Sequence, residues 1–134
     1  MLVAFETLHS IARKKSGKKG LMAIKLDMSK AYDRVEWKFL GAVMSKMNFP
    51  PSLIELIMDC ITTTSLSFLL NGHSVCEVKP SRGLRQGCPL SPYLFILCAD
   101  ALSCMITHSE KNGRGLGVRY GKGGPLISHM FFCR

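Results

Sequence analysis

Residues 21–33 are Leu21-Met22-Ala23-Ile24-Lys25-Leu26-Asp27-Met28-Ser29-Lys30-Ala31-Tyr32-Asp33, and the interpretation of the whole chain depends on them. They begin as a short apolar run interrupted only by Lys25, which is typical of a mostly buried β-strand. The run stops at Asp27, and the polar residues after it predict the entry to a helix. A carboxylate at the end of a buried strand is a rigid mount for a metal ion, but Asp is also a favoured helix cap. On this pattern alone, both roles stay open for Asp27.

The composition is that of a basic globular protein. Of the 134 residues, 47% are hydrophobic and 20% are charged, which argues against disorder and predicts one domain with a real core. Eighteen Lys and Arg residues against nine Asp and Glu residues give a net charge of +9. This charge predicts an anionic partner, and a nucleic acid or a nucleotide fits better than an acidic protein. We expect no membrane partner, because no apolar run is long enough to span a bilayer. We expect no signal peptide, because Glu6 and His9 interrupt the apolar residues near the amino terminus.

The six cysteines form no Cys-x-x-Cys pair and no dense framework. They predict reduced, mostly buried thiols in an intracellular protein of the nucleus or the cytoplasm. Two His and Cys pairs, His73 with Cys76 and His129 with Cys133, could in principle join at a zinc ion, but the spacing lacks a zinc-site signature.

Apolar spacing elsewhere predicts helices and short strands. Helices are expected over 2–12, over 35–47 and from Ser52 through Ile61. A further helix is expected to begin with Ser91 as its cap and to be ended by Gly113 to Gly117. Thr62 to Lys79 predict a hairpin that turns at Asn71-Gly72. Further strands are expected at 116–120 and 126–132, and Asp33 with Glu36 resembles a capping box. Residues 13–19 predict a basic, glycine-punctuated loop that could contact phosphates, act as a nuclear import signal or be a solvated turn.

A second informative stretch is the loop Pro80-Ser81-Arg82-Gly83-Leu84-Arg85-Gln86-Gly87-Cys88-Pro89-Leu90. It is too rich in Gly, Pro and Arg for a regular helix or strand, and too polar for a loop that only packs in the core. With the first stretch it resembles one family, the reverse transcriptases of LINE-type (non-LTR) retrotransposons, particularly those of plants. Residues 25–35, Lys-Leu-Asp-Met-Ser-Lys-Ala-Tyr-Asp-Arg-Val, resemble the first catalytic motif of that family. Residues 81–95 resemble the second.

The resemblance implies an α+β fold, with a polymerase palm-like antiparallel sheet backed by helices and part of the fingers. It implies one incomplete reverse transcriptase domain over residues 1–134. Asp27 would bind the two Mg²⁺ ions of nucleotidyl transfer, with RNA template, DNA primer and deoxynucleoside triphosphates as partners. Tyr32 would lie under the sugar, and Gln86 and Gly87 would lie beside the template and the incoming nucleotide. Arg82 and Arg85 are our own candidates for phosphate contacts, with a loop salt bridge as the alternative.

The sequence departs from the family where the paired carboxylates should follow residues 127–132. The strand there runs into Cys133-Arg134 instead of Ala-Asp-Asp, and a cation at this place would repel magnesium. We therefore expect a truncated or frame-broken copy that is inactive alone. The alternatives are a non-catalytic nucleic-acid-binding remnant and a pseudogene product. We also expect the strand ending at Asp27 to lie next to the strand over 127–132.

Overall fold

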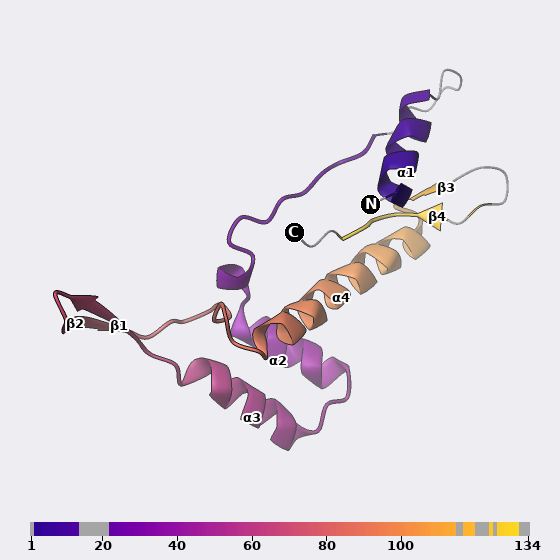
Figure 1. Ribbon diagram of the computed structural model, residues 1–134. Coiled ribbons are helices and arrows are strands. Elements are labelled where there is room, and N and C mark those ends of the chain that lie inside the picture. Colours follow the sequence, from indigo (N-terminus) through magenta and orange to yellow (C-terminus); the bar gives the residue numbers. More distant parts are fainter. Residues whose placement is uncertain (1, 14–21, 115–116, 120–123, 125, 132–134) are drawn as a thin grey trace. The chain divides into compact units, whose positions relative to one another are not determined.

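The computed structural model describes residues 2–13, 22–114, 117–119, 124 and 126–131. They divide into two compact units, Met28–Ala101 and Met1–Asp27 with Leu102–Arg134, and each unit is considered by itself. The elements labelled in Figure 1 follow the order α1 (Leu2–Arg13), a 3₁₀ turn η1 (Tyr32–Arg34), α2 (Trp37–Lys46), α3 (Pro51–Thr62), β1 (Leu66–Leu70), β2 (His73–Val78), α4 (Ser91–Ser109), a π-helical turn η2 (Glu110–Arg114), β3 (Val118–Arg119) and β4 (Leu126–Ile127).

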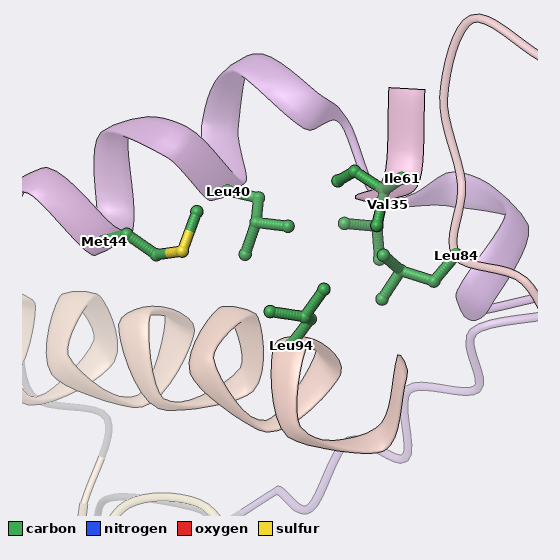
Figure 2. Close-up of a cluster of buried hydrophobic side chains, with 6 residues drawn as sticks. All are labelled: Val35, Leu40, Met44, Ile61, Leu84 and Leu94. Atoms are coloured by element: carbon green, nitrogen blue, oxygen red, sulfur yellow. The ribbon is translucent and has the colours of Figure 1, made fainter. Parts of the chain in front are cut away.

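The core of the Met28–Ala101 unit lies where α2, α3 and the first part of α4 meet. Figure 2 shows that their side chains converge with two from the connecting segments, and the cluster consists of Val35, Leu40, Met44, Ile61, Leu84 and Leu94. Leu40 and Met44 are 0% exposed and Leu94 is 2% exposed. The spacing of Leu40 and Met44 places both on one face of α2, as the helical pattern predicts. Burial of each such side chain contributes about 1.5–3 kcal/mol before entropy is counted.

The start of α2 differs from the predicted capping box. Glu36 precedes the helix in an extended conformation (φ −78°, ψ 122°), and its side chain makes no capping hydrogen bond. Asp33 lies inside the turn η1. The capping-box prediction is therefore wrong, because an extra turn separates Asp33 from the helix.

The hairpin predicted around Asn71-Gly72 is confirmed. Strands β1 and β2 pair antiparallel from Leu66 with Val78 to Leu70 with His73. Asn71 (φ 51°) and Gly72 (φ 83°) both adopt left-handed backbone, as the tight turn of a twisted hairpin requires. Every residue of both strands is exposed.

The predicted strand at residues 21–27 is wrong for the part that is described. Residues 22–27 form no regular element, and Met22, Ile24 and Leu26 are 77%, 69% and 84% exposed. A strand needs a neighbour to satisfy its backbone groups, and β4, the neighbour expected for this segment, pairs antiparallel with β3. The prediction that these two segments share a sheet is therefore also wrong. The described fold is a mixture of helices and two small antiparallel sheets.

One further correction concerns the length of α4. Together with η2 it covers Ser91–Arg114, which is long and apolar enough to cross a membrane by length and composition alone. The expectation that no segment reaches this length is therefore wrong. A single helix of this kind is weak evidence for a membrane protein, since core helices of soluble proteins pass the same test. Leu94 near its start belongs to the buried cluster, but only 11% of the apolar window is buried.

Candidate functional site

A cavity of about 510 Å³ that is open to solvent, in the Met28–Ala101 unit, brings together residues from both informative stretches. Tyr32 comes from the first stretch, while Gln86, Gly87 and Cys88 come from the loop before α4. Ser91, the first residue of α4, completes this side of the lining. One cavity is therefore lined by three residues that the sequence analysis singled out, Tyr32, Gln86 and Gly87.

Backbone hydrogen bonds tie the loop to the segment that contains Tyr32. The Gly83 N–H donates to the Val35 carbonyl (2.8 Å), and the Leu84 N–H donates to the Tyr32 carbonyl (2.9 Å). The indole Nε1–H of Trp37 donates to the Gly83 carbonyl at 2.7 Å. Sequence reasoning missed this contact, because the two residues are 46 positions apart and neither shows a local pattern.

Two glycines of the loop have left-handed backbone but different surroundings. Gly83 has φ +94°, and a Cβ placed on it would lie 3.1 Å from both Cα and the carbonyl oxygen of Asp33. Gly87 has φ +82°, and a Cβ there would meet no heavy atom of the described residues within 4 Å. The first glycine therefore permits a close backbone contact, whereas the second leaves the backbone open beside the cavity.

The Tyr32 ring is both a packing group and part of the cavity lining. It stacks on Phe95 of α4 with ring centroids 5.0 Å apart and an interplanar angle of 10°. It also packs against the buried cluster. Core packing, the simpler interpretation of this residue, thus holds the ring at the edge of the cavity.

The two arginines of the loop behave differently. Arg82 Nη1 lies 3.2 Å from Glu36 Oε1, and the side chains are 58% and 59% exposed. This is the loop salt bridge considered as the alternative role, and an exposed pair of this kind contributes about 0–1 kcal/mol. The Arg85 carbonyl accepts a hydrogen bond from Ser91 Oγ at 2.7 Å. Ser91 is the first residue of α4, so this hydrogen bond connects the start of the helix to the loop.

Two thiols of this unit, Cys88 beside the cavity and Cys98 against the buried cluster, differ in acidity. A hydrogen bond with the Leu90 backbone lowers the pKa of Cys88, and Ser91 and the nearby Arg85 charge act in the same direction, against a smaller effect of desolvation. Burial raises the pKa of Cys98 on α4. All described cysteines are free, but Cys60, Cys76 and Cys104 are exposed, so the prediction of mostly buried thiols is wrong for these three.

Asp27 belongs to the other unit and is exposed. Among the described residues, no group of three or more His, Cys, Asp or Glu side chains could hold a metal ion. A zinc site that joins His73 and Cys76 to His129 has no support in that part of the chain. Cys133, Arg134 and residues 14–19 of the basic loop lie outside the described residues.

A family model described as reverse transcriptase (RNA-dependent DNA polymerase) matches residues 1–120. An uncharacterized mitochondrial protein of Arabidopsis thaliana is 49% identical over 68 residues, which are 51% of this chain and 56% of that protein. The Pol polyprotein from the type-2 retrotransposable element R2DM of Drosophila melanogaster is 32% identical over 77 residues, 58% of this chain and 7% of that protein. The Pol polyprotein of a type-1 R2 element of Popillia japonica is 28% identical over 94 residues, 70% of this chain and 16% of that protein.

No solved structure matches the chain. The chain spans about half the length of the plant relative and a small share of the Pol polyproteins, 7% and 16% for the two named.

Proposed function

The chain belongs to the reverse transcriptase (RNA-dependent DNA polymerase) family, and its relatives include Pol polyproteins of LINE-type (non-LTR) elements. From this premise we propose that the Met28–Ala101 unit binds an incoming deoxynucleoside triphosphate against an RNA template and a DNA primer. We also propose that the helices of the chain and its two antiparallel pairs are part of a polymerase palm with some of the fingers. The observation that carries the proposal is the cavity shared by Tyr32, Gln86 and Gly87.

Each of these residues supplies a group that nucleotide binding uses. The Tyr32 ring is held by Phe95 and offers a rigid surface to a sugar. Gln86 is exposed and can both donate and accept hydrogen bonds at a base or sugar. Gly87 has no side chain, so its backbone can approach a nucleotide closely. Arg85 is exposed and immediately precedes Gln86 in the loop, and a guanidinium there favours phosphates.

The metal requirement is not met by the described residues. Asp27 would be the magnesium ligand under this proposal, and when bound the two ions stabilise the attacking and leaving oxygens of nucleotidyl transfer. One carboxylate supplies two oxygens, whereas Mg²⁺ demands an octahedral set, and the described residues provide no cluster that completes it. We therefore propose nucleotide and template binding, without a catalytic step, for this part of the chain.

A second candidate function is nucleic-acid binding without nucleotide recognition. The net charge of +9 favours it, since phosphate neutralisation alone gives binding that is independent of sequence. The two candidates differ in whether a free deoxynucleoside triphosphate binds.

The test uses the full chain with a primed RNA template, dATP and magnesium. We expect calorimetric binding of dATP, about tenfold weaker in Gln86→Ala because a hydrogen bond to a charged or polar ligand is worth about 1–2 kcal/mol. Glu55→Ala, an exposed change on α3, serves as the control and should leave the affinity unchanged. Primer extension is measured in parallel with Asp27→Asn.

The possible results separate the candidates. Binding of dATP without extension supports the proposed function. Template binding that weakens steeply with salt, with no dATP binding, would instead favour the second candidate. Extension that Asp27→Asn abolishes would show that the metal site is complete and would contradict the metal argument.

A further inference from the structure

The loop that carries Gln86 and Gly87 is anchored at both ends. At its start, Gly83 uses its N–H toward Val35 and its carbonyl toward Trp37. At its end, the Arg85 carbonyl accepts from Ser91 Oγ at 2.7 Å, and the Cys88 N–H donates to the same carbonyl at 3.4 Å. The lining residues Gln86 and Gly87 lie between these anchors and have no buried side chain of their own to hold them.

We propose that Trp37 is a positioning residue for the nucleotide cavity, because its indole N–H fixes Gly83 and thereby sets where Gln86 and Gly87 lie relative to Tyr32. This inference rests on the proposed function of the same cavity. The Trp37 clamp consists of the Trp37 indole, the Gly83 carbonyl and N–H, and the Leu84 N–H.

Packing on both sides of the clamp supports a positioning role for Trp37. The indole packs against the buried cluster, and a partly buried Trp N–H needs an acceptor. On the other side, the Gly83 backbone lies so close to Asp33 that a Cβ would be 3.1 Å from it, and the Leu84 side chain next to it is 3% exposed in the core. The clamp therefore joins the core to the loop at a point where the Gly83 and Asp33 backbones lie close together.

A second link between the same segments provides a matched control. The Arg82–Glu36 ion pair also joins the loop to the start of α2, but both side chains are more than half exposed. Solvent screening makes such a pair weak, so Glu36→Gln should leave the loop in place. The contrast between the two links distinguishes the clamp from any contact that happens to bridge the segments.

The test replaces Trp37 in the full chain by Phe, which removes the donor and shortens the ring. A second variant carries 3-benzothienylalanine at position 37, which keeps the bicyclic shape and lacks the N–H. Amide hydrogen exchange is measured at Gly83 and Leu84, and at Leu40 in the core as the reference. We expect both variants to exchange about fivefold faster at Gly83 and Leu84, with Leu40 unchanged, as the loss of one hydrogen bond predicts.

The functional readout is the dissociation constant of dATP with magnesium and primed RNA template. We expect it to rise about fivefold in both Trp37 variants and to change less than twofold in Glu36→Gln. Unchanged exchange at Gly83 and Leu84, or faster exchange that leaves the dATP affinity intact, would overturn the inference. Faster exchange at Leu40 as well would assign Trp37 to general stability and would also overturn it. If the unaltered chain binds no dATP, the proposed function fails first, which is a different result from equal binding by all variants.

Discussion

Gly83→Ala is the sharpest test of how the loop is held. The change adds one methyl group to a residue with φ +94°, where an L-residue is strained by about 1–2 kcal/mol. The new Cβ would also lie 3.1 Å from the Asp33 backbone, which cannot turn away as a flexible side chain could. Overpacking of this kind costs about 1–3 kcal/mol, so the expected loss of stability is about 2–5 kcal/mol.

Gly87→Ala isolates the backbone strain from the contact. Gly87 has a similar φ of +82°, but a Cβ there would meet no described heavy atom within 4 Å. The expected loss is then the strain alone, about 1–2 kcal/mol. The difference between the two variants measures the close approach of Gly83 to Asp33.

The assay is urea unfolding of the full chain, followed by fluorescence and by far-UV circular dichroism. Trp37 is the single tryptophan of the sequence, so the fluorescence reports on the clamp itself. With a urea dependence of about 1–2 kcal/mol per molar, a difference of about 2 kcal/mol moves the midpoint by about 1–2 M. Equal midpoints for the two variants, or a lower midpoint for Gly87→Ala, would refute the reasoning.

Two further predictions concern the core and the thiols. Leu40→Ala should lower the free energy of unfolding by about 2–5 kcal/mol, because Leu40 is 0% exposed, whereas Leu69→Ala on the hairpin should change it by less than about 0.5 kcal/mol. Similar losses in urea unfolding would contradict the assignment of the core. Cys88 should react with iodoacetamide faster than Cys98 below pH 9, because its lowered pKa leaves more thiolate there, while burial raises the pKa of Cys98. Peptide mass spectrometry over a pH series measures the two reaction rates, and a faster reaction of Cys98 would contradict the described loop geometry.

Features with a local cause could be predicted from the sequence. Apolar spacing predicted both ends of α2 and α3 to within two residues. The pair Asn71-Gly72 predicted the hairpin, because its turn needs two left-handed residues. The segment at 22–27 failed for the opposite reason. Its apolar pattern is that of a strand, but strand pairing is decided by a distant partner, and the described strands pair elsewhere.

The candidate site also combines features that the sequence predicted with features that depend on distant residues. The resemblance singled out Tyr32, Gln86 and Gly87, and they line one cavity, although their roles there stay a prediction. The Trp37 hydrogen bond to Gly83 could not be predicted, because an indole N–H has no sequence pattern that points to a carbonyl 46 residues away. Arg82 had two open roles, and only the three-dimensional position of Glu36 supports the salt bridge.

Binding and metal chemistry are thus expected to separate in this chain. Tyr32 and the start of the loop are held by contacts with the core, since Leu84 is buried next to Gly83 and Tyr32 packs on the cluster. Asp27 has no such support, because residues 22–27 are exposed and form no regular element. A metal site needs its ligands held within a fraction of an ångström, and an exposed segment outside any regular element does not hold Asp27 in this way. Nucleotide affinity should therefore depend on Trp37 and Gly83 and be insensitive to Asp27→Asn.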